Sequence, residues 1–432
     1  MMDQVMSVTR KDHVRPPVRV ALCLAVVTAL VGTGLVALLW SGDDTDDHAA
    51  RTTSGAAPDV PLVKDKGSVV RAATVPLARG RGLVADARGR HLTQRLTTDA
   101  YKMVAVTWAS GRPEVDVRFR NARGWSEWTH LEALTDGPTV GDAESRQATR
   151  RGTELLWVGR SDGVQVRTTA TTGLDLVLID PGVLAADATA TADATATPAA
   201  SATQGSGAAT ATTVARTRSA GTTSAAARPT KAPRPPLYGR SVWKPNPDYL
   251  NGSPVYTNII KQVHVHHTAS ANDYSRADVP AILRGMYRYH TQTLGWFDIG
   301  YNFLVDRFGR SWIGRSGGAR KRVRGAHTLG FNHNSVGIAV IGNYESRNPT
   351  TYAVTAIVRL AAWKLDLDGQ HATGRTWMYS KGSDKYPAGR RVALYRIDGH
   401  RDTNDTACPG ARLYRLLPDI RTRAERRLRY YS

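Results

Sequence analysis

The first hydrophobic pattern in this chain is an almost unbroken apolar run over residues 20–40, preceded by several basic residues. A run of about 20 apolar residues is long enough to cross a bilayer as a helix. Because basic flanks stay on the cytoplasmic side, residues 1–40 are expected to form a cytoplasmic tail and a signal or transmembrane segment, with the rest of the chain outside. The run exceeds a usual signal-peptide core and no clear cleavage site follows it, which slightly favours an uncleaved anchor over secretion.

Between residues 62 and 184 the hydrophobic positions alternate with polar ones at a period of two. Val104, Val106 and Trp108 form one such run, and further short apolar runs follow, separated by Gly, Asp and Ser. Many short strands with turn residues between them predict an all-β, sandwich-like domain over residues 62–184. The pattern indicates no catalytic constellation here, so a binding or spacer role is expected.

Two low-complexity stretches flank the predicted β domain. Residues 185–236 are almost entirely Ala, Thr, Ser, Gly and Pro and contain no aromatic residue. Such a stretch buries too little apolar surface to fold, which predicts a flexible linker. A shorter linker with an acidic run is expected at residues 41–61.

Residues 237–432 combine short apolar runs with apolar stripes at helical spacing. Strands are expected at 259–267, 300–306 and 336–341, and helices at 279–294, 354–367 and 412–429. This alternation predicts an α/β or α+β domain. The chain's 41% hydrophobic content is sufficient for two folded cores.

Positive charge is concentrated in the same C-terminal region. Residues 237–432 hold 30 Lys and Arg against 14 Asp and Glu, within a chain whose formal net charge is +21. Such a balance indicates either a polyanionic partner or a generally basic secreted protein from an arginine-rich proteome. Outside a cell, an anionic envelope polymer is favoured over nucleic acid.

Cys408 is the only cysteine outside the apolar N-terminal run, in which Cys23 lies. Without a second cysteine it cannot form an intramolecular disulfide. Its thiol is therefore a candidate metal ligand, a candidate nucleophile or a buried inert group. It follows His400 by eight residues, in a loop punctuated by Gly and Pro.

Three histidines occur close together in the predicted strand VHVHHTAS. The period of two places His264 and His266 on one face and His267 on the other. Two imidazoles and one thiolate would leave a fourth tetrahedral position for water, which is typical of catalytic zinc. Spacing alone leaves open whether residues so distant in sequence form such a site.

Four ordered segments carry a resemblance to a known family: VHVHHTAS, WFDIGYNFLVDRFGRSWIGR, GAHTLGFNHNSVGIAVIGNY and GHRDTNDTACPG. Together they resemble the peptidoglycan recognition proteins, a group of zinc-dependent N-acetylmuramoyl-L-alanine amidases that includes the phage T7 lysozyme type. The resemblance covers essentially all of residues 237–432, and the tandem domain arrangement is similar to that of actinobacterial proteins. It implies a mixed central β-sheet flanked by helices on both sides, with a groove on one face.

The resemblance implies a role for individual residues as well. His266, His400 and Cys408 match the zinc ligands of the family. Tyr301 matches its catalytic tyrosine, and Thr406 occupies a position held by threonine or lysine in active members. The tyrosine hydroxyl would stabilise an oxyanion, and Thr406 would hydrogen-bond water or oxyanion.

Two further residues are expected to bind substrate. His327 in GAHT matches a histidine that lines the substrate groove, and Arg315 is retained in IGRSGG. Family members that prefer meso-diaminopimelate stems often carry an EGRGW-like stretch at this point. Because Ser316 and Gly317 stand where glycine and tryptophan would be, the preference for the third stem residue stays undetermined.

The implied reaction is hydrolysis of the amide between N-acetylmuramic acid and L-alanine of the stem peptide, in a Zn²⁺-dependent monomer acting on peptidoglycan. Two alternatives remain from the residues alone. One is a non-catalytic peptidoglycan-binding module on the same fold. The other is a cysteine hydrolase that uses Cys408 with His400.

Overall fold

The computed structural model describes residues 59–77, 83–85, 89–170, 172–192 and 231–432. These residues belong to one compact unit, Ala56–Ser432. The predicted membrane segment and most of both predicted linkers lie outside them. Within the described ranges, no helix has the length and apolar character needed to cross a membrane.

The N-terminal domain is built from β-strands, as the alternating pattern predicted. Its strands are β1 (Val63–Lys64), β2 (Arg71–Leu77), β3 (Val84–Ala85), β4 (His91–Leu92), β5 (Leu96–Trp108), β6 (Val115–Asn121), β7 (Gly124–Trp125), β8 (Thr129–His130), β9 (Arg151–Gly152), β10 (Leu156–Thr168) and β11 (Leu174–Asp180). A short helix, α1 (Ala143–Gln147), lies between β8 and β9. The long strand β10 pairs with β5 through an irregular register and with β6 through a continuous one.

The C-terminal domain alternates strands and helices. Its strands are β12 (Gln262–His267), β13 (Phe303–Val305), β14 (Ser311–Ile313), β15 (Ser335–Val340), β16 (Arg375–Tyr379), β17 (Arg391–Tyr395) and β18 (Ile397–Gly399). Its helices are α3 (Arg240–Trp243), α4 (Val279–Arg288), α5 (Thr351–Asp366), α6 (Ala411–Tyr414) and α7 (Leu417–Tyr431), with short turns η3 (Pro247–Tyr249), η4 (Tyr289–Thr293) and η5 (His400–Asp402). The α/β prediction is confirmed.

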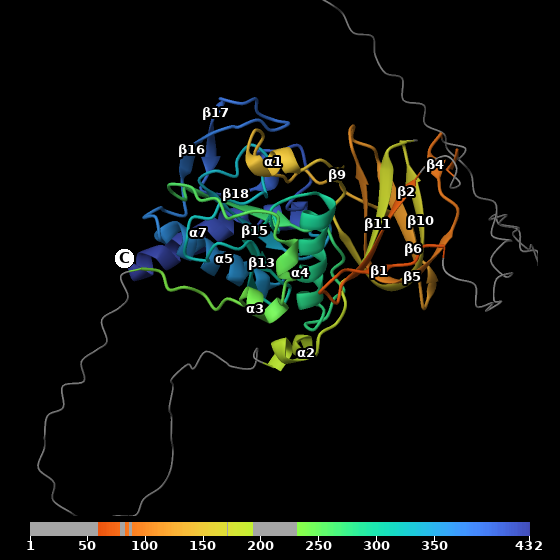
Figure 1. Cartoon of the computed structure of the whole chain (residues 1–432). Coiled ribbons are helices and arrows are strands. Elements are labelled where there is room, and N and C mark those ends of the chain that lie inside the picture. Colours follow the sequence, from red (N-terminus) through yellow and green to blue (C-terminus); the bar gives the residue numbers. More distant parts are fainter. Residues whose placement is uncertain (1–58, 78–82, 86–88, 171, 193–230) are drawn as a thin grey trace, which may run out of the picture. The chain divides into compact units, whose positions relative to one another are not determined.

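A mixed five-stranded sheet organises this domain, in the order β14, β13, β15, β12, β18. Strand β12 runs parallel to both of its neighbours, β15 and β18. Val263 and Val265 of β12 join a core formed with α5 and α7, which lie beside the sheet in Figure 1. The opposite face of β12 therefore carries His264 and His266.

The last predicted helix, at residues 412–429, is in fact two helices, α6 and α7. Pro418 stands at the start of α7. Because proline has no backbone N–H, it is tolerated in the first turn of a helix and interrupts one that would continue through it. The hairpin of β16 and β17, which the pattern did not predict, covers a small cluster of Phe331, Met378 and Leu394.

The predicted linker at residues 185–236 also differs from expectation at its two ends. It begins with a helix, α2 (Ala185–Ala192), in which the buried Asp187 pairs with Arg284 of α4 at 2.6 Å. At its other end, Ala232 is buried against the C-terminal core. Charged and apolar contacts with the C-terminal domain thus order the ends of a segment whose composition alone predicts no fold.

The two domains share a hydrophobic core. Met103 of β5 and Val177 of β11 belong to a cluster that also contains Ile282 and Leu283 of α4. The alternate residues, such as Val104, face the core of the β domain itself. Both faces of these strands are therefore covered.

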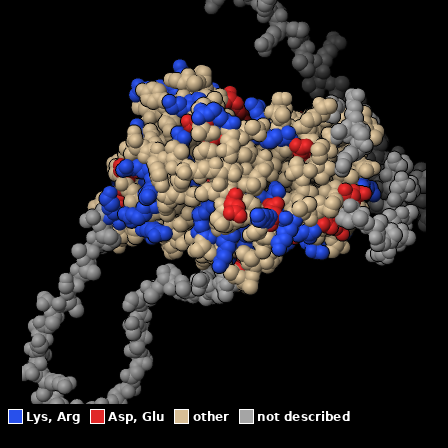
Figure 2. Space-filling model, viewed as in Figure 1, with Lys and Arg blue, Asp and Glu red and all other residues tan. Residues whose placement is uncertain are grey.

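Basic residues remain prominent on the surface. Figure 2 shows many more Lys and Arg than Asp and Glu on the visible face, with a group over the C-terminal helix. That helix, α7, carries a run of arginines in the sequence RTRAERRLR. The surface charge agrees with the expectation of a polyanionic partner.

Candidate active site

Three side chains from separate segments converge at one edge of the sheet. His266 lies near the end of β12, His400 follows the end of β18, and Cys408 lies in the loop beyond η5. Because β12 and β18 are parallel, their carboxyl ends meet at the same edge. A ligand atom of each residue lies within 4.8 Å of those of the other two, and His266 Nδ1 is 3.7 Å from Cys408 Sγ.

This trio fits a zinc ion. All three residues are buried, and burial lowers the pKa of His266 and of His400 well below the usual value. Both imidazoles are therefore neutral, which is the form that binds metal. Burial raises the pKa of the Cys408 thiol, so a divalent cation is the charge that would favour its thiolate. Two nitrogens and one sulfur form a donor set that suits Zn²⁺.

Neighbouring groups hold the three residues in place. The Nε2 atom of His266 lies 3.2 Å from Oγ1 of Thr328, which leaves Nδ1 facing the site. The backbone N–H of His267 points at Cys408 Sγ, at 3.4 Å. Thr406 accepts a hydrogen bond from the Cys408 N–H at 3.2 Å and thereby shapes the loop.

Tyr301 lies beside the trio and His327 lies behind it. The Tyr301 ring centre is 5.4 Å from that of His266, and burial, reinforced by the Asp136 carboxylate, raises the pKa of its hydroxyl. The His327 ring centre is 5.3 Å from that of His266, and the residue is 0% exposed. His327 is therefore buried behind His266 in this structure, and its role in lining a substrate groove stays a prediction.

Gly325 and Gly337 leave room for His327. An added Cβ would come within 2.2 Å of the His327 ring at Gly325 and 2.3 Å at Gly337. Glycine at both positions is thus required for the ring to pack here.

An acidic side chain from the N-terminal domain lies next to the two histidines. Asp136, in the connection between β8 and β9, places Oδ1 3.2 Å from His400 Nδ1 and 3.6 Å from His266 Nδ1. The Asp136 side chain is 2% exposed, and burial raises the pKa of its carboxyl well above the usual value. The sequence offered no signal for this residue, because an aspartate before Gly137 and Pro138 is typical of an ordinary turn.

Arg315, the second predicted substrate-binding residue, is also engaged by the N-terminal domain. Its guanidinium forms a two-pronged ion pair with Glu144 of α1, at 2.6 and 3.0 Å, and donates from Nε to the Ile299 carbonyl. Arg315 and Glu144 are both buried. Glu144 is a second site residue that the sequence did not reveal.

Known families match both domains. Residues 61–204 match the family described as Rv3811 N-terminal galactose-binding domain-like, and residues 256–411 match N-acetylmuramoyl-L-alanine amidase. The β domain is thus galactose-binding-like, and the amidase match spans His266, His400 and Cys408.

Characterised proteins match the C-terminal region. Peptidoglycan-recognition protein SC2 of Drosophila melanogaster is 32% identical over 165 residues, 38% of this chain and 74% of that protein. N-acetylmuramoyl-L-alanine amidase of Homo sapiens is 35% identical over 159 residues, 36% of this chain and 23% of that protein. One solved structure, peptidoglycan recognition protein-LE in complex with tracheal cytotoxin, is 30% identical with a TM-score of 0.34, covering 42% of this chain and 92% of that one.

These matches support a peptidoglycan-related function, either as an amidase or in recognition. The similarity to the Drosophila protein extends over 74% of that protein, and the amidase family match includes the segments around the three candidate ligands. This chain therefore belongs to the peptidoglycan-recognition protein family and carries an amidase-type C-terminal domain.

Proposed function

We propose that this protein is a zinc-dependent amidase that hydrolyses the bond between N-acetylmuramic acid and L-alanine in peptidoglycan. The observation that carries the proposal is the convergence of His266, His400 and Cys408, whose ligand atoms lie within 4.8 Å of one another. Members of the family that only bind peptidoglycan have no need for such a buried donor set. Retention of Tyr301 beside it further supports catalysis over recognition alone.

The chemistry divides between the metal and the protein. Zinc, when bound, supplies a Lewis acid that polarises the scissile carbonyl and lowers the pKa of water towards neutrality. Tyr301 keeps its proton, because burial raises its pKa, and its hydroxyl can donate a hydrogen bond to the developing oxyanion. Thr406 holds the Cys408 loop in shape and offers a further hydroxyl at the edge of the site.

A cysteine hydrolase is the weaker alternative. A nucleophilic cysteine needs a lowered pKa and access to substrate. Burial instead raises the pKa of Cys408, and the residue is 5% exposed. These properties favour a metal ligand over a nucleophile.

The proposed setting is outside the cytoplasm, with the protein either secreted or held by an N-terminal anchor close to the cell wall. The apolar run at residues 20–40 and its basic flank support this location. The basic surface supports an anionic wall polymer as partner. A monomer is sufficient for the proposed activity, because the donor set and Tyr301 come from one chain.

Mass spectrometry of peptidoglycan fragments tests the proposal. Purified zinc-loaded protein should release stem peptides with a free L-alanine amino group, and Cys408→Ala should lose both bound zinc and release. Zinc bound in one equivalent with every glycan–peptide bond intact, in wild type and in Asp136→Ala alike, would favour recognition without hydrolysis.

A further inference from the structure

One segment of the galactose-binding-like domain covers the amidase site. This covering segment, residues 132–147, leaves the domain after β8 and returns before β9, and it contains α1. Asp136 lies near its start and Glu144 near its end. Both carboxylates reach residues of the other domain.

Asp136 lies close to both candidate metal-binding imidazoles, next to the group of His266, His400 and Cys408 whose donor atoms lie within 4.8 Å of one another. Tetrahedral zinc, with bonds of about 2.0 to 2.3 Å, separates its ligand atoms by roughly 3.3 to 3.6 Å. The Oδ1 atom of Asp136 lies 3.2 Å from Nδ1 of His400 and 3.6 Å from Nδ1 of His266. His266 Nδ1 and Cys408 Sγ show a similar separation, 3.7 Å.

The close neighbours of this oxygen all belong to the candidate metal site. Asp136 Oδ1 is buried beside the Nδ1 atoms of His400 and His266, and the Tyr301 hydroxyl interacts with the same carboxyl group. A buried carboxylate whose neighbours are neutral is costly, because it has lost its hydration and has no compensating positive charge. A cation shared with His266, His400 and Cys408 would offset that cost.

The segment around Asp136 is held by the amidase domain. Asn332 donates from Nδ2 to the Gly137 carbonyl at 2.7 Å. The Oδ1 atom of Asn332 accepts from the backbone N–H groups of His327 and Thr328, at 2.8 and 2.9 Å. One asparagine therefore ties the covering segment to the residues that support His266.

Glu144 anchors the other end of the segment. Besides its ion pair with Arg315, Glu144 Oε1 accepts a hydrogen bond from the Phe297 N–H at 3.0 Å. Asp142 pairs with Arg324 at 2.7 Å. Arg315 is the residue expected to bind a carboxylate of the substrate. Its guanidinium is thus already paired with the Glu144 carboxylate of the same chain.

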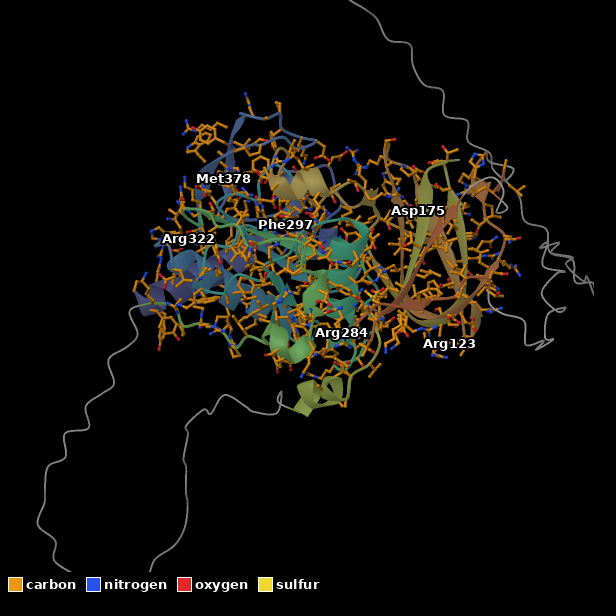
Figure 3. The ribbon with its side chains drawn as sticks, in the orientation of Figure 1. Arg123, Asp175, Arg284, Phe297, Arg322 and Met378 are labelled. Atoms are coloured by element: carbon orange, nitrogen blue, oxygen red, sulfur yellow. The ribbon has the colours of Figure 1, made fainter. Side chains whose placement is uncertain are left out.

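The docked arrangement involves contacts well beyond the segment. The shared core of β5, β11 and α4 lies on one side, and Arg284 binds Asp187 of α2 on another. Figure 3 labels Arg284, which pairs with Asp187, and Phe297, whose backbone N–H binds Glu144 of the covering segment. Opening the site therefore requires withdrawal of the segment or separation of the domains.

We propose that the covering segment is an internal inhibitor of the amidase, in which Asp136 supplies the fourth metal ligand in place of water and Glu144 occupies Arg315 in place of a substrate carboxylate. The inference rests on the proposed zinc amidase function. It makes the resting protein a latent enzyme, because the position for reactive water is filled from within the chain. Substrate binding and the covering segment then exclude each other.

Azide titration of the full chain loaded with Co²⁺ tests the ligand assignment without measuring hydrolysis. The wild-type visible spectrum should not respond to azide, because no coordination position is open. Asp136→Ala should respond, and its zinc affinity in chelator competition should fall by roughly 10- to 100-fold. Asp162→Ala, which removes an exposed aspartate paired with Arg120 on the same domain, should behave like wild type.

Hydrolysis gives the second readout. Asp136→Ala should release stem peptides faster than wild type, by up to about 100-fold if the closed form outnumbers the open form by 99 to 1. Glu144→Gln, which leaves the metal ligands intact, should also raise hydrolysis, by a smaller factor and without loss of zinc affinity. This second variant keeps the test valid if Asp136→Ala folds poorly.

The outcomes separate the inference from the proposed function. A wild-type protein that binds neither Co²⁺ nor zinc would overturn both. Metal binding with an azide response already present in wild type would overturn the inference alone. Slower hydrolysis in Asp136→Ala with unchanged zinc affinity would make Asp136 a catalytic residue and would also overturn it.

Discussion

Strand β12 carries two histidines on the same face, two residues apart, and each lies near a buried carboxylate. His264 Nδ1 is 2.7 Å from Asp398 Oδ1, and neither side chain is exposed. Asp398 comes from β18 of the same domain, whereas Asp136, near His266, comes from the other domain. The same residue type thus has two different roles on one strand. His264 contributes to the packing within its own domain, and His266 contributes to the metal centre that we propose.

The difference arises from position along the strand. His264 lies within the sheet, where Gln262 also donates to Asp398 at 2.7 Å. Burial raises the pKa of Asp398 to about 6, although His264 opposes the rise. His266 lies one pleat further, at the edge where the His400 and Cys408 segments meet. A histidine becomes a candidate ligand where strand ends bring other donors to it.

The largest expected effect is that of His266→Ala. Loss of one of three ligands should abolish stoichiometric zinc binding and lower hydrolysis by about 1,000-fold or more, because the metal supplies several kcal/mol of transition-state stabilisation. Metal analysis and muropeptide release measure both effects. His371→Ala, at a 76% exposed side chain, is the matched control, and equal losses in the two variants would contradict the assignment.

His264→Ala should instead destabilise the fold. It leaves Asp398 buried without its partner, and breaking a buried pair costs about 3–5 kcal/mol. Urea unfolding should show this loss in the free energy of unfolding, while folded protein keeps one zinc per chain. A variant that loses zinc at unchanged stability would place His264 in the metal centre.

Separating the domains should remove Asp136 from His266 and leave the His264–Asp398 pair intact. Val177→Glu places a charge in the shared core, where burial of an unpaired charge costs several kcal/mol. Hydrolysis should rise several-fold and the radius of gyration in X-ray scattering should increase. Val183→Glu is the control, since Val183 is 69% exposed; a larger radius with unchanged hydrolysis would show that the segment does not limit access.

A third histidine–carboxylate pair, His371 with Glu425, gives the smallest effect. Burial alone would raise the pKa of Glu425, but hydrogen bonds, led by that from the Ala372 N–H, lower it from 4.5 to about 2. The unfolded state therefore binds the proton first as pH falls, so the stability contributed by Glu425 is present above pH 4.5 and is lost towards pH 2. Between pH 4.5 and pH 2 the melting temperature should fall less steeply in Glu425→Gln than in wild type. Parallel curves of melting temperature against pH for the two proteins would contradict the prediction.

The sequence predicted the architecture because its patterns are local. The alternation around Val104 and the apolar runs of β12 and β15 indicate directly which side chains are buried. The predicted fold classes of the two domains are confirmed. The spacing of His266, His400 and Cys408 did not by itself group these residues, and the family segments were needed for that. The break at Pro418 has a local cause that the helical stripe concealed.

The covering segment could not be predicted for a different reason. Asp136 and Glu144 have ordinary neighbours in sequence, and their partners His400 and Arg315 lie more than 170 residues away. Their roles depend on how β5 and β11 dock against α4. The apolar residues Met103 and Val177 on the outer face of the sheet were the available sign that this face is covered.

The most direct test is a crystal structure of the full, zinc-loaded chain. We predict one zinc ion bound by Nδ1 of His266, Nδ1 of His400 and Sγ of Cys408, with Asp136 Oδ1 as the fourth ligand at about 2.0–2.2 Å. Zinc held by the same three residues with water in the fourth position and Asp136 withdrawn would contradict the internal inhibitor. Zinc bound elsewhere would contradict the metal centre itself.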